Sequence, residues 1–229
     1  KDTAPTEAPP LVLRPAVLLV GPRQCGKSTL VRHALPRWTH LDLERPADIL
    51  AITADVEGFF DVHSRAVVID EAQRAPEVFP ALRNVIDRGR GRGRFLLLGS
   101  AGPALMRDVS ETLAGRVSVL ELTPFLASEL APARRAADHW FWGDFPPVHA
   151  LRGASARIEW LGAYVTTLLE RDLPALGVRL PARRLRTLWT MLTHVHGNLL
   201  NVSDLARSLG VSSHTVAHDL DVLEAAFMI

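Results

Sequence analysis

The chain has little cysteine, little lysine and no long apolar run, and each shortage excludes something. Cys25 is the only cysteine in 229 residues, so an intrachain disulfide is excluded and a reducing compartment, the cytoplasm, is expected. No apolar run approaches the roughly 18 residues needed to span a bilayer, so no membrane partner is expected. The formal net charge is only +1, which gives no general reason to expect nucleic-acid binding.

Lysine is scarce, and its one internal position is informative. The chain has 26 lysines and arginines, but lysine stands only at positions 1 and 27. Lys27 lies in Gly21-Pro-Arg-Gln-Cys-Gly-Lys-Ser28, directly after the apolar run Ala16–Val20. This is the G-x-x-x-x-G-K-[ST] pattern with a predicted strand before it and a predicted helix after it. It predicts a site for a nucleoside triphosphate, where a compact ammonium is needed.

The residue types of this loop suit phosphate. Gly21 and Gly26 let the backbone curl so that consecutive N–H groups point at phosphate oxygens, and the following helix adds the positive end of its dipole. Lys27 can reach the β- and γ-phosphates, and the Ser28 hydroxyl can ligate Mg²⁺. The predicted nucleotide-binding residues are Gly21, Pro22, Arg23, Gln24, Cys25, Gly26, Lys27, Ser28 and Thr29.

Short apolar runs alternate with helical patterns over the first 130 residues. The runs are Ala16–Val20, His40–Leu43, Ala66–Ile69, Phe95–Leu98 and Val117–Leu122. Alternation of this kind predicts an α/β fold, with a mainly parallel sheet covered on both faces. After about Pro132 the pattern is helical without clear strands.

Two acidic residues, Asp70 and Glu71, follow the third apolar run. An acid at the carboxyl end of a buried strand lies beside the phosphate loop in a parallel α/β sheet. Asp70 is predicted to hold Mg²⁺ through water, and Glu71 to activate the attacking water as general base. Ser100, after the fourth run, is predicted to sense the γ-phosphate, with a plain strand-end cap as the alternative.

Arg116 stands between a predicted helix and the fifth apolar run. In a homo-oligomer it could reach a neighbouring subunit's nucleotide, where such an arginine is worth roughly 10³ to 10⁵ in rate. A surface ion pair or a helix C-terminal cation explains the same residue equally well. The oligomeric state therefore depends on what Arg116 does.

Together these residues resemble AAA+-type ATPases, and more narrowly a bacterial family of AAA+-like ATP-binding proteins with a C-terminal domain of unknown function. The matching segments are 21–28, 69–73, 98–101, 114–116, 122–125, 142–146 and 169–172, with the final helix-turn-helix. The resemblance implies ATP and Mg²⁺ as cofactors, a sheet order of 5-1-4-3-2, a helical and winged-helix region, and a further downstream domain. Arg171, in a matching motif, could contact the nucleotide or pair with Asp172.

On this basis the chain is expected to have four parts. They are a flexible leader at 1–11, a P-loop ATPase domain at 12–131, a helical lid region at 132–196 and a winged-helix-like helix-turn-helix at 197–229. The final apolar stretch, 226–229, suggests that the full-length protein continues.

The predicted helix-turn-helix gives a mixed signal about DNA. Asn201 or Ser203 would cap a helix ending at Leu209, and Ser212 or Ser213 would cap the next. The exposed start of that second helix has none of the Arg, Lys, Asn or Gln residues that direct base readout favours. Asp219 and Asp221 would repel phosphate, whereas Arg183, Arg184 and Arg186 could contact it. The arginine-rich segment 88–94 could also contact phosphates, with a solvated connector as the alternative. A DNA partner and a protein partner both stay open.

The main hypothesis is a Mg²⁺-dependent ATPase whose nucleotide state moves the helical and winged-helix region. The alternative is an ATP-gated regulatory switch that hydrolyses little and docks on DNA or protein. A measurement of ATP turnover would distinguish the ATPase from the regulatory switch.

Overall fold

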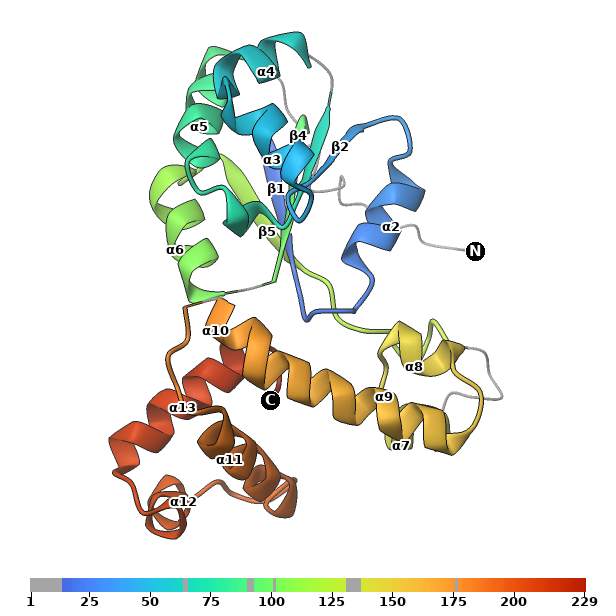
Figure 1. Cartoon of the computed structure of the whole chain (residues 1–229), viewed down its shortest axis with the longest axis vertical. Coiled ribbons are helices and arrows are strands. Elements are labelled where there is room, and N and C mark those ends of the chain that lie inside the picture. Colours follow the sequence, from blue (N-terminus) through green and yellow to red (C-terminus); the bar gives the residue numbers. More distant parts are fainter. Residues whose placement is uncertain (1–13, 64–65, 90–92, 101, 131–136, 176) are drawn as a thin grey trace, which may run out of the picture. The chain divides into compact units, whose positions relative to one another are not determined.

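The computed structural model of the chain describes residues 14–63, 66–89, 93–100, 102–130, 137–175 and 177–229. It has two compact units, Lys1–Leu126 and Ala127–Ile229, each with its own hydrophobic core (Figure 1). None of the helices in these described ranges is long and apolar enough to cross a membrane.

The first unit is built on a five-stranded parallel sheet of order β2-β3-β4-β1-β5. Its strands are β1 (Ala16–Val20), β2 (Thr39–Asp42), β3 (Val67–Asp70), β4 (Phe95–Gly99) and β5 (Val117–Glu121). β1, β3 and β4 are buried along their whole length, which explains why β1 is apolar throughout and β3 and β4 are apolar up to their last residue. The predicted fold class and strand order are confirmed.

Helices cover both faces of this sheet. They are α2 (Lys27–Ala34), α3 (Pro46–Thr53), α4 (Val56–Val62), the 3₁₀ turn η1 (Ala72–Arg74), α5 (Val78–Arg88) and α6 (Pro103–Thr112). Figure 1 shows α2 on one side of the sheet and α5 and α6 on the other. Val31 of α2 packs on Val17 and Leu19 of β1 in one buried cluster. α2 is thereby fixed against the strand that precedes it.

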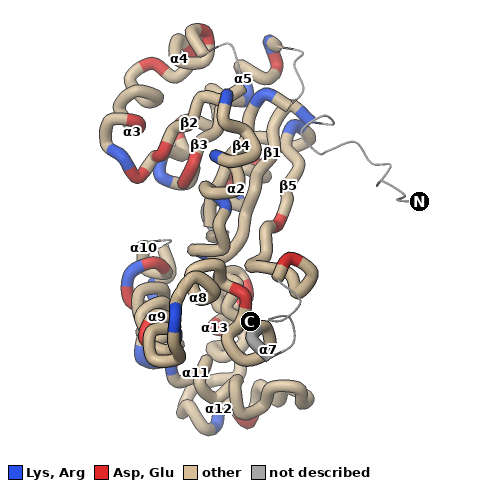
Figure 2. Tube along the Cα trace, turned by 90° about the vertical axis from the view of Figure 1, so that its right-hand side faces the viewer, with Lys and Arg blue, Asp and Glu red and all other residues tan. Residues whose placement is uncertain are grey.

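The order of the strands brings three chain segments to one edge of the sheet. β4 lies between β1 and β3, with Val20 opposite Gly99 and Ile69 opposite Leu97. Because all strands are parallel, the loop after β1, the acids after β3 and Ser100 after β4 meet at the carboxyl edge. Figure 2 shows acidic positions near the ends of β2 and β3, with basic positions beside them.

The second unit is helical. It contains α7 (Ala137–Trp142), α8 (Pro146–Ala150), α9 (Ala154–Thr167), the π-helical η3 (Leu168–Asp172), α10 (Leu173–Ala175), α11 (Ala182–His194), α12 (Val202–Leu209) and α13 (Ser213–Ala225). Its core joins residues of η3, α11, α12 and α13. Among residues 137–175 and 177–229 no strand is present, so the structure does not show the wing of a winged helix.

The helix-turn-helix pair begins and ends at capping residues. Asn201 accepts hydrogen bonds from the backbone N–H groups of Ser203 and Asp204, at 3.1 and 3.2 Å. Ser212 accepts one from Thr215 N at 3.1 Å. Gly210 ends α12 with a φ of 67°, a left-handed conformation that favours glycine. Of the two candidates proposed for each cap, Asn201 and Ser212 are the ones used.

A buried ion pair corrects two expectations about this unit. Asp219 of α13 is fully buried, and its carboxylate accepts from Arg184 Nε at 2.7 Å and from Arg184 Nη2 at 3.0 Å. The expectation that Asp219 would repel phosphate is therefore wrong, because its charge is enclosed and paired. Arg184 is likewise committed to this contact. Asp221, on the other side of α13, is exposed.

Two arginines of the basic segment 88–94 have structural partners. Arg88 pairs with Glu57 of α4 at 2.6 Å. Arg94 donates to the carbonyl oxygens of Phe60 and His63 at 2.7 and 3.2 Å, at the end of the same helix. Both residues therefore contact α4 or its C-terminal end. Arg90 and Arg92 lie outside the described residues. The phosphate-binding role considered for this segment receives no support from Arg88 or Arg94.

Candidate nucleotide site

The loop Gly21–Ser28 joins the end of β1 to the start of α2. Gly26 caps α2 with a φ of 101°, a value that residues with a side chain rarely adopt. Gln24 also has a positive φ, 66°. Such turns direct successive backbone N–H groups toward one point and form an anion-binding nest. Thr29, in the first turn of α2, is exposed.

Lys27 is buried, and the carbonyls of the loop hold its ammonium. Its Nζ donates to Gly21 O at 2.8 Å and to Pro22 O at 2.9 Å, and it lies 3.9 Å from Cys25 Sγ. Burial lowers the pKa of Lys27, while the charges of Glu71 and Asp70 oppose that shift. Burial also raises the pKa of the Cys25 thiol, against the effect of Lys27. The loop therefore encloses both the Lys27 side chain and the Cys25 thiol.

Arg23 extends from the loop to an acid that the sequence did not single out. Its Nη2 lies 3.0 Å from Glu44 Oε1, and the same oxygen lies 3.9 Å from Arg74 Nη1. Glu44 follows β2 by two residues, at the carboxyl edge of the sheet. It therefore connects the phosphate loop with the turn after β3.

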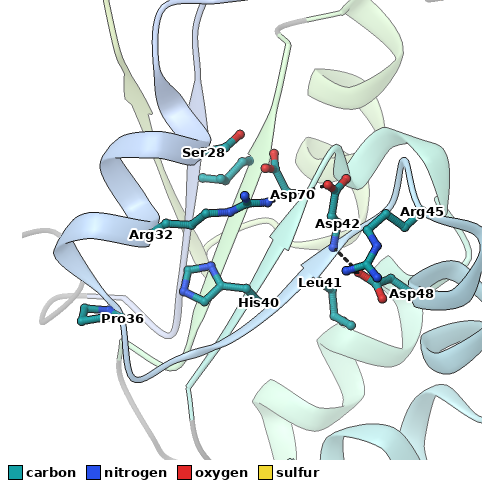
Figure 3. A pocket seen from close by; sticks show the side chains of 10 residues that line it. Ser28, Arg32, Pro36, His40, Leu41, Asp42, Arg45, Asp48 and Asp70 are labelled. Carbon is teal, nitrogen blue, oxygen red and sulfur yellow. Dashed lines mark hydrogen bonds and ion pairs between the residues drawn. The ribbon is translucent and has the colours of Figure 1, made fainter.

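Asp70 and Ser28 line one cavity. Asp70 ends β3 and is buried, and Ser28 lies in the first turn of α2. Their side chains come from facing elements in Figure 3, where Arg32 points from α2 toward Asp70 and Asp42. The cavity has a volume of about 390 Å³ and is lined by Ser28, Arg32, Pro36, His40, Leu41, Asp42, Arg45, Asp48, Asp70 and Leu98. A hydroxyl and a carboxylate are the oxygen ligands that Mg²⁺ accepts beside phosphate and water.

No group of three or more His, Cys, Asp or Glu in the described part of the chain could hold a metal ion by itself. A Mg²⁺ site at Ser28 and Asp70 fits this finding, because protein sites for Mg²⁺ use one or two carboxylates and complete the shell with substrate phosphates and water.

Glu71 follows Asp70 in an uncommon conformation. Its φ and ψ are 56° and 45°, the left-handed region, and its N–H donates to Asp70 Oδ1 at 3.1 Å. Non-glycine residues held there cost about 1–3 kcal/mol each and cluster at functional sites. Burial raises the pKa of the Glu71 carboxyl, while a hydrogen bond from Gln73 and the charge of Arg23 oppose that rise. A carboxylate in such surroundings is suited to accept a proton.

Gln73 joins two of the predicted catalytic residues. Its Nε2 donates to Glu71 Oε2 and lies 3.5 Å from Ser100 Oγ. The structure therefore brings Glu71 and Ser100 together through Gln73, whose role the sequence alone did not indicate. Gln73 stood in a matching motif, 69–73, but nothing in the sequence indicated where its amide would point.

Arg116 lies at the amino ends of the strands, opposite the carboxyl edge that holds the phosphate loop. It directly precedes β5, and its carbonyl accepts from Ala16 N at the start of β1. The phosphate loop begins after Val20, and a strand rises about 3.3 Å per residue, so about 15 Å separate Arg116 from its own loop. Its guanidinium donates to both oxygens of Asp87, Nε at 2.6 Å and Nη2 at 2.8 Å. This is the surface ion pair that the sequence left open, and its hydrogen bonds lower the pKa of Asp87.

Arg171 lies in the other unit, within η3. Its Nε donates to Asp172 Oδ1 at 2.9 Å, and Asp172 is buried. The structural ion pair considered for this residue is therefore formed. Most of the Arg171 side chain nevertheless stays exposed.

Comparisons with known proteins agree with this architecture. Residues 13–131 match the model of a family described as an AAA domain, and residues 133–229 match one described as a domain of unknown function. Two curated relatives, uncharacterized proteins Mb2031c of Mycobacterium bovis and Rv2008c of Mycobacterium tuberculosis, are each 44% identical over 219 residues. That alignment covers 94% of this chain and 49% of each relative, so the chain spans about half their length.

Among solved structures, the Walker-type ATPase Paby2304 of Pyrococcus abyssi superposes with a TM-score of 0.62. The match covers 93% of this chain and 85% of that one at 14% identity, which is a likeness of fold. The sheet and helices of this chain therefore share the fold of that protein. With more than half of its residues matched by the AAA domain model, the chain belongs to the AAA domain family of P-loop proteins.

Proposed function

We propose that the chain binds ATP with Mg²⁺ at the loop Gly21–Ser28 and hydrolyses it. The observation that supports this most is the meeting of an enclosed cation, Lys27, with the carboxylates of Asp70 and Glu71 at one edge of the sheet. The loop amides and Lys27 would bind the phosphates, and Ser28 and Asp70 would hold Mg²⁺. When bound, Mg²⁺ would neutralise charge that develops on the β- and γ-oxygens.

In this proposal Glu71 acts on the attacking water. The water oxygen bonds to the γ-phosphorus as its proton passes to Glu71, and the bond to the β–γ bridging oxygen breaks, leaving ADP and phosphate. Ser100, on the neighbouring strand end, would contact the γ-phosphate. The left-handed backbone at Glu71 supports the assignment, because such a conformation is kept where the direction of a side chain matters.

Binding is tested by replacing Lys27. Lys27→Ala is expected to weaken ATP binding about 10- to 100-fold, since a hydrogen bond to a charged group contributes about 1.5–3 kcal/mol. Titration of each variant with ATP and Mg²⁺ in a calorimeter measures this. Lys1→Ala removes the chain's other lysine and should bind as wild type. Equal affinity in all three proteins would contradict the assignment.

Arg116 is proposed, second, to act on a neighbouring subunit's nucleotide, because it lies too far from its own loop. Its pair with Asp87 supplies the control. Turnover per chain that rises with protein concentration, and that is lost in Arg116→Ala but kept in Asp87→Ala, would assign this role. A rate per chain that stays constant with concentration, with both variants active, would leave Arg116 as an ion-pair residue only.

We propose that a partner of α12 and α13 is a protein. The exposed positions of α13 include no arginine or lysine; they are Ser213, His214, Ala217, His218, Asp221 and Glu224. The arginine of α12, Arg207, pairs with Asp204 at 3.0 Å. Specific DNA recognition relies on such side chains for bases and phosphates. Fluorescence anisotropy with mixed-sequence duplexes at low salt tests this, and saturable binding of the duplexes would overturn it.

A further inference from the structure

Gln73 is placed between the two strand ends that the proposed ATPase reaction uses. It lies in η1, directly after Glu71, and its amide nitrogen faces both Glu71 Oε2 and Ser100 Oγ. A primary amide nitrogen carries two hydrogens, so one side chain can donate to both oxygens. The contact with Glu71 is close, and the 3.5 Å contact with Ser100 is at the outer limit for a hydrogen bond.

The backbone of η1 fixes this arrangement. Glu71 adopts the left-handed conformation, and Arg74 N donates to Glu71 O at 3.0 Å, which closes a tight turn. This turn returns the chain so that Gln73 lies against the side chain two residues before it. The left-handed conformation of Glu71 costs free energy, and it allows the Glu71 side chain to pair with Gln73.

Gly99 leaves the space that the Gln73 amide occupies. A Cβ at position 99 would lie 2.7 Å from Gln73 Oε1 and 2.6 Å from Leu105 Cδ2, closer than real Cβ contacts. Gln73 Oε1 is buried and has no hydrogen-bond partner among the described residues. An unpaired buried acceptor costs about 1–3 kcal/mol. A leucine or methionine would avoid that cost, so the presence of an amide favours a role for its nitrogen.

From this geometry we infer that Gln73 is a positioning residue, which holds the Glu71 carboxylate by one oxygen and links it to Ser100. The inference rests on the proposed ATP hydrolysis. With Oε2 held by Gln73, Oε1 is the oxygen left to accept the proton of the attacking water. A ligand that contacts Ser100 at the end of β4 would thereby affect Glu71, the proposed base at the end of β3. Gln73 itself makes no bond to substrate and exchanges no proton.

The test separates positioning from folding. Gln73→Leu keeps the volume and removes the amide, and Gln73→Asn keeps an amide that is one methylene too short. Both are expected to lower kcat about 10- to 100-fold, the size of effect that misplacing a catalytic group by about 1 Å has. The Kd for ATP and the melting temperature should stay near wild type. Glu77→Gln, an exposed change on the same segment, is the control.

A double-mutant cycle supplies a readout that a structural role would not give. If Gln73 acts through Glu71, Gln73→Leu will not reduce the residual turnover of Glu71→Gln any further. Additive losses in the double variant would overturn the inference, as would a kcat within twofold of wild type in both Gln73 variants. A loss of ATP affinity that matches the loss of kcat would overturn it too.

Failure of the inference and failure of the proposed function are distinguishable. Active wild-type protein, inactive Glu71→Gln and fully active Gln73→Leu would reject only the role of Gln73. Wild-type protein that binds ATP without turnover would reject hydrolysis, and the role of Gln73 with it. If Gln73→Leu does not fold, the Gln73→Asn variant, with its amide retained, carries the same comparison.

Discussion

Glu71→Gln is expected to lower ATP turnover about 10²- to 10⁴-fold while leaving ATP affinity within a few-fold of wild type, because general-base catalysis contributes about that much. The amide of glutamine cannot accept the proton of the attacking water, yet it nearly keeps the size and shape of the carboxylate. Glu71 is half-buried, and its left-handed backbone fixes the direction of its side chain. Phosphate release at saturating ATP and Mg²⁺ measures the change.

The matched control is Glu77→Gln, which makes the same substitution at an exposed position six residues later. It should turn over ATP at the wild-type rate. Equal rates in wild type and Glu71→Gln, with binding intact in both, would remove Glu71 from the role of base. Loss of binding in Glu71→Gln would instead mean that the residue contributes to the nucleotide site itself.

The second large effect concerns stability. Asp219→Asn is expected to destabilise the helical unit by about 3 kcal/mol, the lower end of the range for breaking a buried ion pair. The lower end applies because a quarter of the Arg184 side chain is exposed and water can reach it. In the variant, Arg184 keeps its charge between α11 and α13 without a counter-ion. Urea denaturation followed by tryptophan fluorescence measures the loss.

The probe and the control both come from the chain. Four of the five tryptophans, Trp140, Trp142, Trp160 and Trp189, lie in the helical unit, so most of the emission comes from it, and Trp189 of α11 donates its Nε1–H to Met228 O at 3.3 Å. Asp221→Asn removes an exposed acid two residues away on the same helix and should change stability by less than about 0.5 kcal/mol. Equal midpoints for the two variants would show that the Arg184–Asp219 pair contributes little.

The elements predicted best from the sequence are those whose burial leaves a continuous apolar pattern. β1 and β4 read as strands because both faces are covered, and their order in the sheet agrees with the resemblance to AAA+-type ATPases. α3 and α4, of eight and seven residues, were not predicted, because such short helices show little of a helical period and neither belongs to a recognisable motif. The equally short α2 and α12 were predicted from the phosphate loop and the helix-turn-helix pattern. The Asp55 cap on Gly58 N and Pro46 at the start of α3 were the available local signals.

Contacts between residues far apart in the sequence were the part that could not be predicted. Asp219 looked like a surface acid on a recognition helix, since nothing in its surroundings pointed to Arg184, 35 residues before it. Glu44 was not identified because its partner Arg23 lies 21 residues earlier, in the phosphate loop. Gln73 was within the motif, but its role depends on the direction of a side chain. The chemistry of the phosphate loop can be predicted from its residue types and their spacing. Which distant residues pair with one another depends on how the chain folds.

The most direct test of the central claim is the identity of the nucleotide that remains bound after incubation with ATP and Mg²⁺. Wild-type protein and Glu71→Gln are each incubated, separated rapidly from free nucleotide, and denatured for chromatography. The account predicts ADP on the wild-type protein and intact ATP on Glu71→Gln. Intact ATP on both proteins would contradict hydrolysis at this site, and the absence of nucleotide from both would contradict the binding site itself.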